Sequence, residues 1–445
     1  MSNVQFIVQP GGAVKGRIRV PGDKSISHRS IMLGSIAQGV TTVTGFLEGE
    51  DALATLQAFR EMGVEITGPV NGEVTIHGVG LNGLKEPSKP LDMGNSGTST
   101  RLLAGILAGQ NFDVTLIGDA SLSKRPMKRV TEPLADMGAV IETAVGGTLP
   151  MTIRGTGKKL KALDYVLPMA SAQVKSCVLL AGLYADGRTC ALEPAPTRDH
   201  TERMLNGFGY PVQSEKLDER QTRACLQGGG ELTACHIDVP SDISSAAFFM
   251  VAAAICEDSD LVIEHVGMNP TRTGVIDILK LMGADIQLEN FHEVGGEPVA
   301  DVHIKYAPLT GIEIPQSLVP LAIDEFPVLF VAASAAKGTT VLSGAEELRV
   351  KESDRIQVMA DGLQALGIEA VPTPDGMIVK GGDQCVQKGA IQSHHDHRIS
   401  MAMTIAGLRA KSPITIDDCA NVNTSFPVFL ELINQVGMSV AAEEA

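Results

Sequence analysis

A short stretch near the start of the chain combines residue types that bind anions. Pro21 ends a β-rich run, because proline donates no backbone hydrogen bond. Ser25 or Ser27 is then expected to cap a helix, whose first turn exposes backbone N–H groups and the positive end of the helix dipole. With Lys24 and Arg29 beside it, this helix start suits a phosphate or a carboxylate. The alternative is an ordinary exposed helix start with two solvated cations.

Cations also stand at other predicted helix starts. If the helices of each domain run parallel, these starts gather at one end and face the other domain. So many cations at one place in an acidic chain indicate a ligand with several negative charges. We therefore expect an active site in a cleft between two domains, lined by Lys24, Arg29, Arg125, Lys351, Arg355 and Arg398.

Two carboxylates are interspersed with these cations. Asp324 opens one predicted helix, and Glu352 lies between Lys351 and Arg355. Carboxylates among cations could transfer protons during a reaction. They could equally be salt-bridge partners of the neighbouring cations, and the sequence leaves both interpretations open.

Composition limits the class of protein. Of 445 residues, 44% are hydrophobic and 20% charged, which is typical of a globular protein with more than one core. The formal charge of −16 argues against a nucleic-acid partner. Seven scattered cysteines without a CxxC pair predict reduced thiols and no zinc site. With no signal peptide and no apolar run of bilayer length, we expect a cytoplasmic protein with no membrane partner.

A two-helix pattern recurs along the chain and indicates an internal repeat. The first helix of each copy is apolar on nearly every face, which predicts burial, and is expected at 27–38, 97–110, 171–186, 243–257, 325–337 and 396–411. The second helix ends near a glycine suited to a left-handed backbone and is expected at 53–63, 130–138, 200–209, 274–283, 354–367 and 426–437. Six such β/α units predict an α/β fold.

The domain boundaries follow from two similar segments of the sequence. Residues 19–23 and 238–242 are similar, and three repeats lie between them. We interpret both segments as crossings between two domains of three repeats each. The predicted N-terminal domain is 23–241, and the other domain is discontinuous, formed by 1–22 and 242–445.

No metal site is expected from the sequence. His394, His395 and His397 are close together, but adjacent residues at a helix start point in different directions. No Cys/His cluster elsewhere completes a ligand set.

Several segments together resemble a known enzyme family, the 5-enolpyruvylshikimate-3-phosphate (EPSP) synthases. The segments are 21–29, 91–98, 124–126, 349–355 and 396–398, and the resemblance covers essentially the whole chain. Residues 168–175 and 197–200 are similar to the second class of this family. The resemblance implies an inverse α/β fold of two domains with three units each. It also implies transfer of the carboxyvinyl group of phosphoenolpyruvate to the 5-hydroxyl of shikimate 3-phosphate, with no metal or organic cofactor. We expect a monomer.

The resemblance also implies roles for individual residues. Shikimate 3-phosphate would be held by Lys24, Ser25, Arg29, Ser171, Ala172, Gln173, Arg198, Asp324 and Lys351. Phosphoenolpyruvate would be held by Lys24, Gly97, Arg125, Gln173, Arg355 and Arg398. The catalytic residues would be Lys24 and the proton-transfer pair Asp324 and Glu352.

The chain departs from the family pattern at a few positions. Some members have a lysine beside the last Phe-Pro, where this chain has Thr424 and Ser425. Ala172 stands where others have a second serine. Second-class members that tolerate glyphosate have alanine at the position of Gly97, so we expect this protein to be glyphosate-sensitive.

Two other functions fit part of the sequence. UDP-N-acetylglucosamine enolpyruvyl transferase shares the fold, but its mobile loop has a cysteine ahead of Arg-Pro, and residues 118–126 contain none. A non-catalytic anion-binding repeat protein would keep Lys24 and Arg125 but would have no use for Asp324 and Glu352.

Overall fold

The computed structural model describes residues 4–218, 221–382 and 390–444, which form two compact units. Unit 1 comprises Met1–Pro21, Pro240–Glu293 and Pro298–Ala445, and unit 2 comprises Gly22–Val239 and Val294–Glu297. Each unit has its own hydrophobic core. The short segment Val294–Glu297 belongs to unit 2 although its neighbours in the sequence belong to unit 1, which the sequence did not indicate.

All twelve predicted helices are present in the described residues. The first helices of the repeats are α1 (Lys24–Ile36), α3 (Gly97–Leu107), α5 (Ala172–Gly182), α7 (Ile243–Ile255), α9 (Phe326–Ala335) and α11 (His397–Gly407). The second helices are α2 (Glu50–Glu61), α4 (Lys128–Asp136), α6 (His200–Gly207), α8 (Gly274–Leu281), α10 (Arg355–Ala365) and α12 (Phe429–Gln435). None of these helices is long and apolar enough to cross a membrane.

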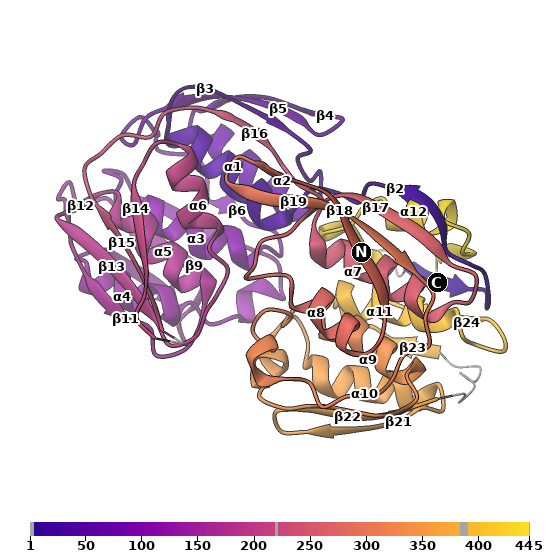
Figure 1. Cartoon of the computed structure of the whole chain (residues 1–445). Coiled ribbons are helices and arrows are strands. Elements are labelled where there is room, and N and C mark those ends of the chain that lie inside the picture. The colour runs from indigo at the N-terminus through magenta and orange to yellow at the C-terminus, as the bar shows by residue number, and fades with distance from the viewer. Residues whose placement is uncertain (1–3, 219–220, 383–389, 445) are drawn as a thin grey trace. The chain divides into compact units, whose positions relative to one another are not determined.

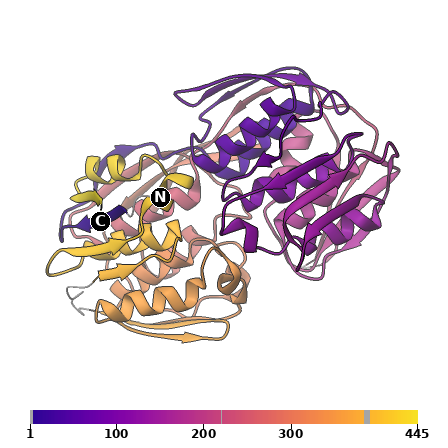
Figure 2. The same cartoon turned by 180° about the vertical axis from the view of Figure 1, so that it is seen from behind.

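The first helices are buried, as their apolar composition predicted. Every residue of α7 is buried, and in α9 only the last residue is not. Within each unit these helices run between sheets that lie on the outside (Figures 1 and 2). A helix in this position needs apolar residues on all sides, because it contacts protein on all sides.

The prediction that glycines end the second helices is also confirmed. Gly63, Gly138, Gly283, Gly367 and Gly437 all have positive φ angles, between 81° and 107°. A side chain is disfavoured in this conformation, so glycine ends the helix at little cost.

The sheets of unit 2 share one strand order. The strand after a first helix lies between a parallel strand on one side and the third strand of its own repeat on the other. The three sheets are β16 (His236–Asp238), β3 (Gln38–Thr44), β5 (Glu73–Val79), β4 (Glu65–Val70); β6 (Leu91–Asp92), β7 (Val114–Ile117), β9 (Thr148–Arg154), β8 (Val140–Ala144); and β11 (Asp164–Val166), β13 (Arg188–Glu193), β15 (Thr222–Gln227), β14 (Val212–Lys216). A two-stranded pair, β10 (Leu160–Lys161) and β12 (Ala185–Asp186), joins the latter two repeats.

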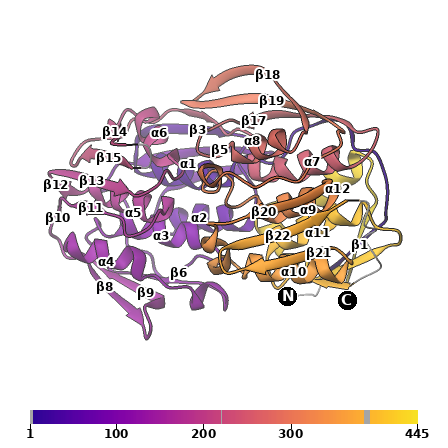
Figure 3. The ribbon, with the colours of Figure 1, turned by 60° about the horizontal axis from the view of Figure 1, so that its bottom comes forward.

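Unit 1 repeats this order in two of its sheets, where it uses the N-terminal strands to complete it, and the third sheet has three strands in the described part of the chain. Its sheets are β2 (Lys15–Ile18), β17 (Asp260–Gly267), β19 (Glu297–Lys305), β18 (Asp285–Val294); β20 (Gly338–Leu342), β22 (Gly376–Gly381), β21 (Glu369–Thr373); and β23 (Ala390–Gln392), β24 (Ile414–Asp417), β1 (Val4–Val8), β25 (Val440–Glu444). Strand β2 is the parallel neighbour of β17, and β1 fills the place of the third strand beside β24. Figure 3 shows β20, β22 and β21 side by side.

The prediction that all cysteines are reduced is wrong for one pair. Cys190 and Cys225 form a disulfide. The cause is the strand register, because antiparallel β13 and β15 place these two residues directly opposite each other. Their separation of 35 residues in the sequence gave no sign of this pairing.

Candidate active site

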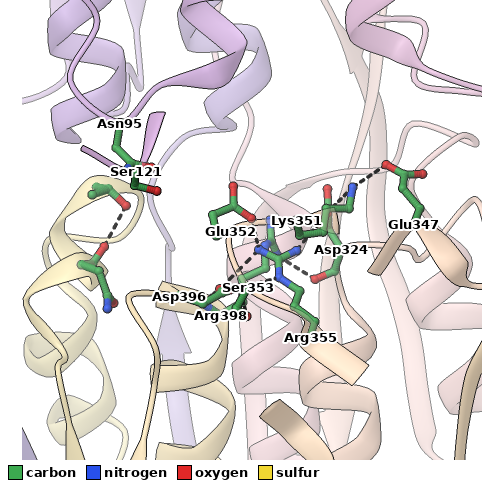
Figure 4. Close-up of polar contacts among 12 residues, drawn as sticks. Asn95, Ser121, Asp324, Glu347, Lys351, Glu352, Ser353, Arg355, Asp396 and Arg398 are labelled. Carbon is green, nitrogen blue, oxygen red and sulfur yellow. Dashed lines mark hydrogen bonds and ion pairs between the residues drawn. The ribbon is translucent and has the colours of Figure 1, made fainter. Parts of the chain in front are cut away.

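Three helix starts in unit 1 bring together a cluster of charged side chains (Figure 4). We call Asp324, Lys351, Glu352, Arg355, Asp396 and Arg398 the Arg355 cluster. Asp324 precedes α9, the segment 351–355 leads from a short 3₁₀ turn (Glu346–Val350) into α10, and Asp396 caps α11. The cap residue Asp354 accepts a hydrogen bond from the backbone N–H of Gln357, which explains why α10 begins where it does.

Arg355 is the centre of this cluster. Its Nε lies 2.8 Å from Oδ2 of Asp396, its Nη2 lies 2.7 Å from Oε2 of Glu352, and its Nη1 lies 3.3 Å from Oδ1 of Asp324. Only 2% of the Arg355 side chain is exposed. Burial disfavours the charge, but the carboxylates of Asp396, Glu352 and Asp324 outweigh it and raise the pKa of Arg355. The guanidinium is therefore a permanent cation held in a fixed direction.

Lys351 provides a second cation in the cluster. Its Nζ lies 3.4 Å from Oδ1 of Asp324 and 2.6 Å from Oε1 of Glu347. Burial opposes its charge, but these two carboxylates raise the pKa of Lys351 above its usual value. Both carboxylates of the predicted proton pair thus have salt-bridge partners, as the alternative interpretation of the sequence expected.

Arg398 joins the cluster from the first turn of α11. Its Nη1 donates to the backbone carbonyl of Asp324 over 3.0 Å and lies 3.7 Å from Oε1 of Glu325. Glu325 is buried and accepts a hydrogen bond from Ser244. Buried polar groups behind Asp324 therefore fix the backbone to which Arg398 is bonded.

In unit 2, the predicted anion-binding helix start has a different cap from the expected one. Asp23, and neither Ser25 nor Ser27, caps α1, because its Oδ1 accepts from the backbone N–H of Ile26 at 2.9 Å. The helix consequently begins at Lys24, three residues earlier than predicted. Lys24 forms an ion pair with Asp51 in the first turn of α2, with 24% of the Lys24 side chain exposed.

A second group in unit 2 connects α3, α5 and the segment after β7. Gln173 accepts a hydrogen bond from Nη1 of Arg101 at 2.7 Å and donates to Thr98 at 3.0 Å. Arg125 donates to Oδ1 of Asn95 at 2.6 Å. Gly97 begins α3 between these side chains, and a Cβ built there would lie 2.9 Å from Nη1 of Arg101 and 3.3 Å from Nη1 of Arg125.

Arg29 is more deeply buried than a solvated helix-start cation would be. Its guanidinium donates to Oγ1 of Thr201 at 2.7 Å, to Oγ of Ser176 at 2.9 Å and to the backbone carbonyl of Ser25 at 3.0 Å. Burial lowers the pKa of Arg29 to about 10. The interpretation of Arg29 as a solvated surface residue is therefore excluded.

The remaining predicted site residues are half-buried. Ser171 caps α5, Ala172 is its first residue, and Arg198 lies in the loop between β13 and α6. Within unit 1 the structure brings together all the predicted site residues of that unit. Within unit 2 it distributes them over the starts of α1, α3 and α5 and two loops, and it links Gly97, Arg125 and Gln173 most closely.

Some residues of these networks are not among the site residues that the sequence predicts. Asp396 holds Arg355, Asp51 holds Lys24, and Asn95 holds Arg125. Asn95 and Asp396 do lie in segments that carry the family resemblance, and an aspartate directly before a helix is also typical of an N-cap. Within the described parts of the chain, no three His, Cys, Asp or Glu side chains are placed to hold a metal ion.

Comparisons with known proteins agree on one family. Residues 8–433 match the family model described as EPSP synthase (3-phosphoshikimate 1-carboxyvinyltransferase). A 3-phosphoshikimate 1-carboxyvinyltransferase of Hydrogenovibrio crunogenus is 76% identical, with 100% of this chain and 99% of the relative covered. The enzyme of the same name from Alkalilimnicola ehrlichii is 65% identical, with 99% and 98% covered.

Solved structures are similar along the whole chain. EPSP synthase from Acinetobacter baumannii is 60% identical, with a TM-score of 0.89 and with 99% of this chain and 100% of that chain covered. The enolpyruvyl transferase NikO from Streptomyces tendae has a TM-score of 0.79 over the full length of both chains. At 15% identity, it is similar in fold alone.

Proposed function

This chain belongs to the EPSP synthase family, and on that premise we propose that it transfers the carboxyvinyl group of phosphoenolpyruvate to shikimate 3-phosphate. The acceptor atom is the 5-hydroxyl oxygen, and inorganic phosphate is released. The observation that carries the proposal is the contact of one buried guanidinium, that of Arg355, with both carboxylates of the pair Asp324 and Glu352.

The charges of the substrates account for the cations. Each substrate has a carboxylate and a phosphate of about −1.5 to −2 charge at neutral pH. We assign shikimate 3-phosphate to Lys24, Ser25, Arg29, Ser171, Ala172, Gln173, Arg198, Asp324 and Lys351. We assign phosphoenolpyruvate to Lys24, Gly97, Arg125, Gln173, Arg355 and Arg398.

The reaction needs a group that gives a proton and later takes one. In the addition step the CH₂ of phosphoenolpyruvate accepts a proton, while the 5-hydroxyl loses its proton and its oxygen attacks the neighbouring carbon. In the elimination step the new methyl group loses a proton and phosphate leaves. Asp324 and Glu352 are assigned to these transfers. Arg355 is assigned to the negative charge on the departing phosphate, because a fixed cation needs no reorganisation during the reaction.

An assay of phosphate release tests this function. The purified protein is supplied with phosphoenolpyruvate and either shikimate 3-phosphate or UDP-N-acetylglucosamine. We expect release only with shikimate 3-phosphate. Release only with the nucleotide sugar would assign the chain to the sister activity, and release with neither would leave an anion-binding protein.

We further propose that the protein acts in the cytoplasm as a monomer without a nucleic-acid or membrane partner. The formal charge of −16 supports the absence of nucleic acid from its partners. Light scattering of the purified protein should give a mass near 46.8 kDa, and a mass of twice that value would overturn the monomer.

A further inference from the structure

A buried lysine lies behind the proposed substrate residues of unit 2. Nζ of Lys175, in α5, is 3.1 Å from Oε1 of Glu193 at the end of β13 and 2.8 Å from Oε1 of Glu202 in α6. The three side chains are between 2% and 5% exposed. Lys175 is therefore closed off from solvent and from any ligand. The family resemblance gave it no role.

Glu193 connects Lys175 to the loop that carries Arg198. Glu193 accepts hydrogen bonds from the backbone N–H of Thr197 at 3.3 Å and from its hydroxyl at 2.5 Å. Arg198 is the next residue. Since Lys175 holds the same carboxylate, it limits how far this loop can move.

Glu202 connects Lys175 to the hydrogen-bond acceptors of Arg29. Glu202 follows Thr201, and Lys175 precedes Ser176. Thr201 and Ser176 are the two hydroxyl groups to which the Arg29 guanidinium donates, and they are bonded to each other at 2.8 Å. The ion pair between Lys175 and Glu202 thus joins α5 to α6 directly beside the acceptors of Arg29.

We propose that Lys175 is a positioning residue for shikimate 3-phosphate, which fixes Arg29 through α5 and α6 and Arg198 through Glu193. This inference rests on the proposed function and on the assignment of both arginines to that substrate. Lys175 touches no substrate atom. It fixes the acceptors of the Arg29 guanidinium and the loop that carries Arg198 before the substrate arrives, so that less conformational freedom is lost on binding.

The charge balance of the region is consistent with this role. The buried cations Lys175 and Arg29 face the buried carboxylates Glu193 and Glu202, and the buried Asp23 and Glu297 also act on Arg29. Burial opposes the charge on Lys175, but the two carboxylates raise its pKa above the usual value. Removal of the lysine alone would leave one carboxylate uncompensated in the interior, which is a recognised cause of unfolding.

The test must therefore separate positioning from folding. We would compare Lys175→Met, Lys175→Arg, Glu193→Gln and the charge-balanced double variant Lys175→Met with Glu202→Gln. A control, Ile153→Ala, removes buried contacts from β9 of the same unit without touching this network. For each variant, the melting temperature, kcat and the Michaelis constants for both substrates are measured, each with the other substrate saturating.

We expect the charge-balanced double variant to fold and to raise the Michaelis constant for shikimate 3-phosphate at least tenfold, and Glu193→Gln to raise it in the same direction with a lower melting temperature. The Michaelis constant for phosphoenolpyruvate should change less than twofold. Lys175→Arg should recover most of the affinity, because it keeps the charge. Ile153→Ala should lower the melting temperature and leave both Michaelis constants unchanged.

Three results would overturn the inference. One is a folded double variant with the parent Michaelis constant for shikimate 3-phosphate. Another is an equal rise for both substrates, and the third is the same rise in Ile153→Ala. Failure of the proposed function is distinct, because it would show as a parent protein that releases no phosphate from the two substrates.

Discussion

The Nε atom of Arg355 lies 2.8 Å from Oδ2 of Asp396, with 2% of the arginine and none of the aspartate side chain exposed. Asp396 also caps α11, where it accepts from the backbone N–H of Arg398 at 3.0 Å. One carboxylate therefore fixes both a cation of the cluster and the helix start that carries another.

Asp396→Ala is expected to lower the free energy of unfolding by about 3–5 kcal/mol, because it leaves a buried guanidinium with one partner fewer. Urea unfolding measures this loss. Glu369→Ala is the matched control, since it breaks an exposed ion pair with Lys380 in the same unit and should cost no more than about 1 kcal/mol. Similar losses in the two variants would contradict a structural role for Asp396.

Lys24→Met is expected to abolish most activity without unfolding the protein. Loss of one donor to the transition state typically costs about 2.7–4 kcal/mol, or roughly 10²–10³ in kcat. Phosphate release measures the effect. Lys89→Met, which removes an exposed lysine paired with Glu61 in the same unit, should retain the parent rate. A well-folded Lys24→Met protein with near-normal kcat would refute the catalytic role.

Glu352→Gln tests the proton-transfer pair. The substitution keeps the shape of the side chain but removes the group that would exchange a proton with the substrate. We expect exchange of solvent deuterium into the CH₂ of phosphoenolpyruvate to slow far more than substrate binding weakens. Exchange at the parent rate would leave Glu352 as a salt-bridge partner of Arg355 only.

Gly97→Ala tests the discrimination between phosphoenolpyruvate and glyphosate. The new methyl group would lie 2.9 Å from the Arg101 guanidinium and 3.3 Å from that of Arg125, so both must shift. Glyphosate is the longer ligand, so the added methyl group should clash with it before it clashes with phosphoenolpyruvate. One methyl group in a pocket is worth roughly 1–3 kcal/mol, or about 10- to 200-fold. The inhibition constant for glyphosate should therefore rise more than the Michaelis constant for phosphoenolpyruvate, whereas a parallel rise of both would defeat the argument.

We expect the free energy of unfolding to fall in mild acid because of the buried side chain of His28. Burial, with Lys24 and Arg29 nearby, holds the pKa of His28 well below its usual value. The unfolded chain therefore binds a proton first, and stability falls as the pH drops below about 6.5, by up to about 1.4 kcal/mol per pH unit.

His28→Asn is the matching variant, because an amide nitrogen can replace the ring Nδ1 that lies 2.8 Å from Oγ1 of Thr55. Urea unfolding at pH 7.5 and 5.5 should show a smaller pH dependence for the variant than for the parent. Equal pH dependence would mean that His28 does not contribute.

The repeat architecture could be predicted because it depends on local signals. Small-residue helices and terminal glycines such as Gly63 and Gly367 mark each copy in the sequence. Helix starts were less exact, with 27–38 predicted and Lys24–Ile36 observed, since several neighbouring residues can cap the same turn. For this reason the cap of α1 is Asp23, although Ser25 was an equally suitable residue type.

The contacts that could not be predicted are those between residues far apart in the sequence. Cys190 meets Cys225 only because of a strand register, and β1 completes a sheet with β24 more than 400 residues later. Lys175 was visible within a motif, but its two carboxylate partners come from β13 and α6. Local patterns indicate which residues carry charge, and tertiary packing decides which charges meet.

The most direct test of the central claim is a single reaction in D₂O, with mass spectrometry of the product. Addition followed by elimination predicts one phosphate released for each carboxyvinyl ether formed from phosphoenolpyruvate and shikimate 3-phosphate. It also predicts deuterium in the CH₂ group of that product, because this carbon passes through a methyl group. Phosphate release without the ether, or an ether free of deuterium, would contradict the account.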